Sequence, residues 1–134
     1  MNEIQFYVLI AVLAALEGGL VLAGIMPPIS SYSIGQIILS LAGIGTTAYM
    51  GWTFAKTGMK KVAIKGTIAG TISIAIILLS AAIGLMAGIP VLGMQIPSAY
   101  VPLAFISIAV PNIVLFMIAA ILGTLTAKKL QKKP

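Results

Sequence analysis

Residues 51–66, GWTFAKTGMKKVAIKG, contain four of the eight lysines of a 134-residue chain that has only two acidic residues. A long apolar run precedes this basic stretch and another follows it. The chain is 60% hydrophobic and 7% charged, whereas soluble domains carry about 25% charged residues. The sequence therefore predicts an integral membrane protein in which residues 56–66 connect two membrane spans.

Four apolar runs have about the 20 residues that a helix needs to cross a bilayer. Adjacent prolines are expected to stop the first helix, and three further prolines to exclude helix between the third and fourth runs. Pro111 lies inside the fourth run, where it is expected to kink the helix without ending it. The prediction is an all-α fold in one domain, residues 1–134, with four helices arranged as two helical hairpins. The runs cover residues 4–26, 36–55, 67–89 and 103–127.

The lysines predict the orientation of these spans, because positive residues near membrane ends are retained on the cytoplasmic side. Four spans place both termini and the 56–66 connection on one side of the membrane. All eight lysines belong to these segments, and the two loops on the other side carry no charge. Both termini are therefore expected to be cytoplasmic, and topology signalling alone would explain the lysines. The basic residues are Lys56, Lys60, Lys61 and Lys65 in the connection and Lys128, Lys129, Lys132 and Lys133 near the end.

The side-chain inventory argues against catalysis. The chain has no His, Cys, Asp or Arg. Thiol nucleophiles, Ser-His-Asp triads and the usual metal-ligand clusters are therefore not expected. The sequence predicts a protein that is not an enzyme and has no metal site.

Glu17 lies inside the first apolar run, where an ionisable side chain is costly and suggests a function. The small multidrug transporters also have four short helices and a glutamate in the first, so one interpretation is proton-coupled transport of small molecules. The other interpretation is a neutral or hydrogen-bonded glutamate at a helix interface. Gly18 and Gly19 follow directly and would allow helices to approach closely there.

Small residues recur at four-residue spacing, which places them on one helix face and permits close packing of backbones. Residues 66–70 (GTIAG) and 84–88 (GLMAG) both have this pattern. The contacts could be made within one subunit or between copies of the chain. The predicted packing or assembly positions are Gly19, Gly66, Gly70, Gly84 and Gly88.

Residues 41–84 also carry a family resemblance. Trp52 and Phe54 precede the connection, the sequence GMKKV occupies residues 58–62, and Gly66 and Gly70 follow. This arrangement resembles the two-helix core of the major pilins of conjugative type IV secretion systems, the subunits of T-pili and F-like pili. The similar core is a hairpin over residues 36–90. Those pilins have two membrane helices, so a four-run chain would be an elaborated version, such as an archaeal DNA-exchange pilin.

The resemblance implies a subunit that waits in the cell membrane and then polymerises into a helical tube, the extracellular pilus. Lys56, Lys60, Lys61 and Lys65 would face the lumen. The implied partners are other copies of the chain, membrane components of the secretion machine, a structural membrane lipid held between subunits, and DNA that passes without sequence recognition. No other cofactor is implied. The alternatives are a non-catalytic small membrane subunit of a larger complex and the transporter that would use Glu17.

Overall fold

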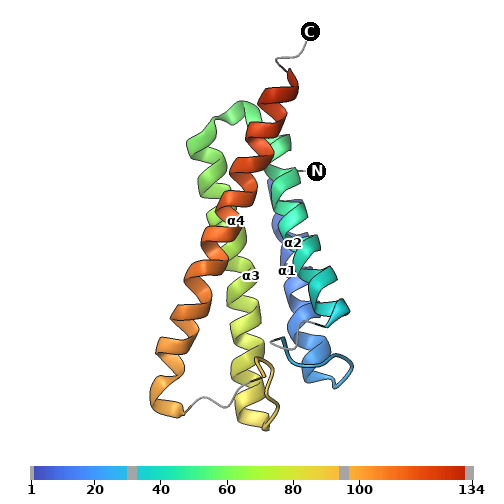
Figure 1. The fold of residues 1–134 in the computed structure, drawn as a ribbon, viewed down its shortest axis with the longest axis vertical. Helices are drawn as coiled ribbons and strands as arrows, with labels where there is room; N and C mark the ends of the chain where they lie inside the picture. Colours follow the sequence, from blue (N-terminus) through green and yellow to red (C-terminus); the bar gives the residue numbers. More distant parts are fainter. Residues whose placement is uncertain (1, 30–32, 94–96, 132–134) are drawn as a thin grey trace.

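The computed structural model describes residues 2–29, 33–93 and 97–131, and in these ranges the chain is all-helical, as predicted. Four helices are long and apolar enough to cross a membrane. Figure 1 shows them as a bundle with both ends of the chain at the same end. The elements are α1 (Glu3–Leu22), α2 (Ile34–Thr53), the 3₁₀ turn η2 (Ala55–Thr57), α3 (Met59–Ala87), the 3₁₀ turn η3 (Ser98–Tyr100) and α4 (Val101–Gln131).

The first helix ends earlier than the adjacent prolines predicted. α1 stops at Leu22, and Gly24 takes the left-handed conformation with φ 76°. The amide of Gly24 donates to the carbonyl of Val21, and the amide of Ile25 donates to the carbonyl of Leu20. This pair of bonds is a Schellman motif, which satisfies the last carbonyls of a helix and favours glycine at the left-handed position.

The third helix begins earlier than expected, so most of the predicted basic turn is helical. Only Phe54, η2 and Gly58, with φ 105°, separate α2 from α3. Lys60, Lys61 and Lys65 all lie in the first turns of α3. Lysine is a good helix former, and no residue between Met59 and Ala87 breaks the helix.

The fourth helix is longer than predicted at both ends. Pro102 was expected to exclude helix, but it lies in the first turn of α4, where the missing amide costs nothing. α4 also continues through Pro111 without a break and includes Lys128 and Lys129. Pro111 therefore lies inside the helix without ending it, which is what the sequence predicted.

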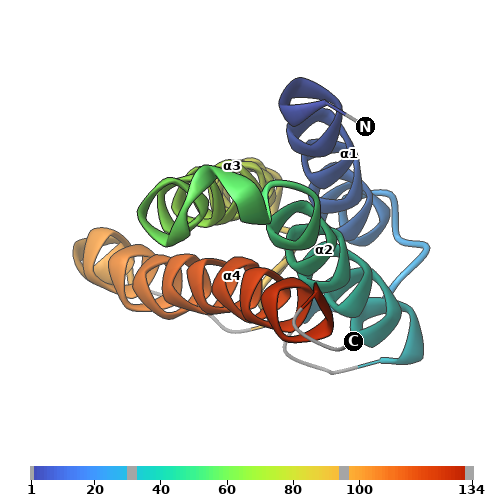
Figure 2. The same ribbon diagram turned by 90° about the horizontal axis from the view of Figure 1, so that it is seen from above.

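The helices pack in the order α1, α2, α4, α3 around the bundle. The most extensive contacts are α3 with α4 and α2 with α4, followed by α1 with α3 and α1 with α2. α2 and α3, although consecutive, touch only at a few points, and Figure 2 shows α4 lying alongside both. Residues 36–90 therefore do not form a closely packed hairpin by themselves, because α2 and α3 each pack mainly against α1 and α4.

A crossing of small residues brings α2 and α4 together. A methyl group added to Gly51 would collide with the backbone of Ala120, and one added to Gly123 would collide with the backbone of Ala48. The hydroxyl of Thr124, fully buried, donates to the carbonyl of Gly51 over 2.7 Å. In a membrane, where lipid is as apolar as leucine, such close packing and hydrogen bonds drive helix association.

The predicted packing glycines have different environments. Gly66 and Gly70 face α4, where an added Cβ would lie within 3 Å of backbone or side-chain atoms in residues 113–120. Gly84 faces the backbone of Ile89, whereas Gly88 has φ 75° and caps the end of α3. An added Cβ on Gly19 meets no atom within 4 Å. Three of the five predicted packing glycines, Gly66, Gly70 and Gly84, therefore make their close contacts within one chain.

The α2–α4 crossing predicts opposite results for two glycines of the same helix. Gly51→Ala should lower the free energy of unfolding by about 1–3 kcal/mol, because the new methyl overpacks the contact with Ala120. Gly45→Ala should be neutral or stabilising by up to about 1 kcal/mol, because its Cβ enters open space and alanine favours helix. Unfolding in mixed micelles, followed by circular dichroism, measures both. Equal effects of the two substitutions would contradict the close crossing.

Candidate functional site

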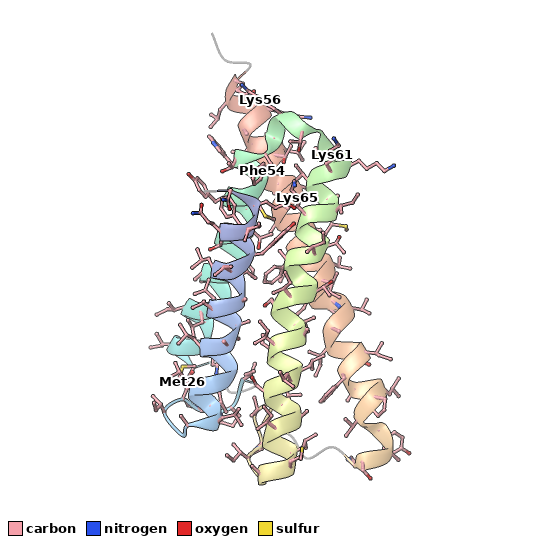
Figure 3. The ribbon with its side chains drawn as sticks, turned by 180° about the vertical axis from the view of Figure 1, so that it is seen from behind. Met26, Phe54, Lys56, Lys61 and Lys65 are labelled. Atoms are coloured by element: carbon pink, nitrogen blue, oxygen red, sulfur yellow. The ribbon has the colours of Figure 1, made fainter. Side chains whose placement is uncertain are left out.

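One end of the bundle is basic and the other carries no charge. Figure 3 shows Lys56, Lys61 and Lys65 gathered at one end, with Met26 at the opposite end. Lys128 and Lys129, near the end of α4, lie on the basic side as well. This distribution agrees with the orientation expected from the positive-inside rule.

Lys65 forms an ion pair and a cation–π contact within the chain. Its Nζ lies 2.8 Å from Oε2 of Glu3 and 5.0 Å from the centre of the Phe54 ring. The hydroxyl of Tyr7 donates to the other oxygen of Glu3 over 2.9 Å. The side chain of Lys65 is only 17% exposed. These contacts join α1, the end of α2 and α3, so Lys65 is engaged inside the chain.

Lys56, Lys60 and Lys61 are exposed and have no ion pair or hydrogen-bond partner among the described residues. Lys60 and Lys61 lie in the first turn of α3, where the helix dipole is positive. Positive side chains at this end of a helix are unfavourable, whereas they are favourable at a helix C-terminus. No described residue of the chain therefore offsets the positive charge of these three lysines.

The second candidate feature is Glu17, a residue that is 7% exposed. Ser40 on α2 donates its hydroxyl to Oε1 of Glu17 over 3.0 Å. Next to it, Gly18 lets Ser80 of α3 approach the backbone of α1, because an added methyl would collide with the Ser80 hydroxyl. Glu17 is therefore held between α1 and α2, close to the uncharged end of the bundle.

Two cavities meet at Glu17. The larger, about 410 Å³, lies between all four helices and includes the polar side chains of Ser40, Ser73 and Asn112 in a mostly apolar wall. The smaller, about 190 Å³, is lined by Glu17, Ser40, Gln36 and three aliphatic residues. Ile29 of the first uncharged loop lines both cavities, and its amide donates to Val91 of the second loop over 2.8 Å. The paired loops therefore border the space beside the carboxylate.

Sequence reasoning identified Glu17 but missed its neighbours. Gln36 and Ser40 are four residues apart, so they lie on one face of α2, and both are polar in an apolar span. This spacing was a readable signal for a polar face towards another helix. The pairing of Glu3 with Lys65 was also missed, because the 61 intervening residues gave no sign that α1 and α3 begin at the same end of the bundle.

The fold and the charge distribution define a helical membrane protein with four candidate spans and one basic end. Comparison with protein-family models, with curated proteins and with solved structures finds no match for the chain.

The environment of the lysines predicts their chemical reactivity. In detergent-solubilised protein, an amine-reactive reagent should modify Lys56, Lys60 and Lys61 quickly and Lys65 several-fold more slowly, because Lys65 is paired and mostly covered. Glu3→Gln should speed the modification of Lys65 alone. Mass spectrometry of peptides over a time course gives the rates. A Lys65 rate equal to that of Lys61 in the unmodified protein would contradict the ion pair.

Proposed function

We propose that this chain is the major pilin subunit of a conjugation-like secretion system. In this proposal the subunit is stored in the cell membrane and polymerises with bound lipid into a tube. DNA passes through the tube between cells. The proposal rests on the resemblance of residues 41–84 to conjugative pilins and on the geometry of the basic end.

The observation that carries the proposal is the group of three free lysines at the connection between α2 and α3. Lys56 in η2 and Lys60 and Lys61 in the first turn of α3 are exposed and unpaired in the described chain, and the helix dipole disfavours the latter two. An anionic partner would relieve this electrostatic cost. Phosphate groups of lipid or DNA are such partners, and contacts with a phosphate backbone need no base recognition.

The sides of the bundle support assembly in lipid or with other copies. Large aliphatic side chains remain exposed along every helix, for example Ile38 and Leu41 on α2 and Ile118 and Leu122 on α4. In a membrane these faces contact acyl chains, and in a polymer they would contact neighbouring subunits and bound lipid. Because Gly66 and Gly70 are occupied by α4 of the same chain, contacts between subunits would use these aliphatic faces instead.

A lumen lined only by lysines would hold DNA tightly, since each neutralised phosphate adds to affinity. Anionic lipid headgroups beside the lysines would offset this attraction and leave a lumen in which DNA slides. Lys65, which is paired with Glu3, would then stabilise the subunit and contribute little to the lumen. The free lysines Lys56, Lys60 and Lys61 would set its charge.

The double substitution Lys60→Gln with Lys61→Gln tests this role. It should leave pilus number and length unchanged and lower DNA transfer by about tenfold, because anionic headgroups would then dominate the lumen and repel phosphate. Lys56 and Lys65 remain to hold the membrane orientation. Electron microscopy of sheared surface material and transfer between cells are measured in the same strain.

The matched control is Lys128→Gln with Lys129→Gln, which removes the same charge from the same end of the bundle but from α4. Transfer should be unaffected in this control. Normal transfer through normal tubes in the Lys60 and Lys61 variant would show that those lysines act only as topology signals. Surface material without any tube made of this chain, in the unmodified strain, would overturn the pilin proposal.

A further inference from the structure

We propose that Glu17, Ser40 and Gln36 form a binding site inside the bundle for a small organic cation that carries N–H donors, such as an amidinium or ammonium compound with an apolar body. The site needs one copy of the chain and does not depend on the proposed pilus.

The first observation is that Glu17 accepts fewer hydrogen bonds than a carboxylate can. Glu17 is largely buried as a residue and lies in a span, where an ionised group without compensation is very costly. Among the described residues it accepts one hydrogen bond, from Ser40, and it forms no ion pair. The described lysines lie at the basic end of the bundle, away from this position. The carboxyl avoids this cost either by taking up a proton or by pairing with a positive charge, and among the described residues such a charge would have to come from a ligand.

Gln36 supplies a second, independent observation. Its side chain is 2% exposed, and Nε2 donates to the carbonyl of Pro27 over 3.3 Å. This bond fixes the orientation of the amide, because a carbonyl accepts but does not donate. The remaining atom, Oε1, is buried and has no hydrogen-bond partner. Buried polar atoms are nearly always paired, so an unpaired acceptor indicates a missing donor.

These acceptors border the same space. Glu17 and Ser40 line both cavities, and Gln36 lines the smaller one, one helical turn from Ser40. A group with several N–H donors could bond to Oε2 of Glu17, and it would reach the buried Oε1 of Gln36 once the Gln36 side chain turns towards the cavity. A quaternary ammonium has the charge but no donor, and a neutral amide has donors but no charge. The pattern of one buried carboxylate and one unpaired carbonyl therefore favours a cation with N–H groups.

The larger cavity accommodates the rest of such a ligand. Its volume of about 410 Å³ lies in the usual range of small-molecule sites, and its wall is aliphatic and aromatic, with Ile10, Ile77 and Phe116 among the lining residues. Ser73 and Asn112 offer further polar contacts from α3 and α4. The apolar body would lie against this wall while the cationic group lies at Glu17.

Three probes test the proposal with the full chain in nanodiscs of zwitterionic lipid. They are benzamidinium, neutral benzamide, and benzyltrimethylammonium, which has the charge without N–H donors. Isothermal titration calorimetry at neutral pH, with empty nanodiscs as the blank, should show saturable binding of benzamidinium that is at least about tenfold tighter than that of either other probe, as expected for charge-assisted hydrogen bonds. This comparison within the unmodified protein needs no variant to fold.

Two substitutions then locate the site. Glu17→Gln should weaken benzamidinium binding by about tenfold or more, and Gln36→Met by about two- to tenfold, since it removes one neutral acceptor. Glu3→Gln is the matched control, because it alters the only other acid of the chain at the far end of the bundle, and it should leave binding unchanged. Circular dichroism verifies that each variant remains helical.

Three results would overturn the proposal. Absence of saturable benzamidinium binding would show that Glu17 needs no cation. Equal binding of benzyltrimethylammonium would show that charge alone is recognised and that the unpaired carbonyl of Gln36 plays no part. Equal affinity in Glu17→Gln and the unmodified chain would place the binding elsewhere. The presence or absence of pili affects none of these measurements.

Discussion

The close backbone contact between α2 and α4 determines the rest of the arrangement. Gly51 against Ala120 and Gly123 against Ala48 leave no room for side chains between the two helices, and Thr124 bonds across the contact to the Gly51 carbonyl. Since lipid provides no hydrophobic force between helices, small residues and hydrogen bonds of this kind decide which helices are neighbours. α4 also packs against α3 through Gly66 and Gly70, so it holds α2 and α3 on either side of itself.

Both candidate features follow from this order. Because α2 and α3 do not close on each other, a cavity remains between the four helices, and α1 places Glu17 beside it. Because Gly58 permits a short connection, α3 begins immediately with its lysines, and Lys65 reaches Glu3 at the start of α1. The ion pair neutralises one lysine of the connection and leaves the other three exposed without a partner in the described chain. The same bundle therefore presents a polar interior at one end and a basic surface at the other.

Sequence predicted the all-helical class, the four spans and the shared side of the termini, because hydropathy and lysine placement report these directly. Helix ends were less accurate, since Gly24 rather than Pro27 ends α1 and lysines do not interrupt α3. The order of the helices around the bundle was not predictable, because small-residue spacing occurs on several helices and does not specify which helix each of them contacts. The cavity and the unpaired Oε1 of Gln36 depend on that order and were therefore hidden as well.

The most direct test of this account is the set of nuclear Overhauser contacts between α2 and α4 in isotope-labelled protein in nanodiscs. The account predicts strong cross-peaks from the Hα protons of Gly51 to those of Ala120, and from Gly123 to Ala48, with few between α2 and α3. An absence of the α2–α4 cross-peaks, together with extensive α2–α3 contacts, would contradict it. In that case residues 36–90 would form a closed hairpin, and neither the cavity nor the position of α4 described above would exist.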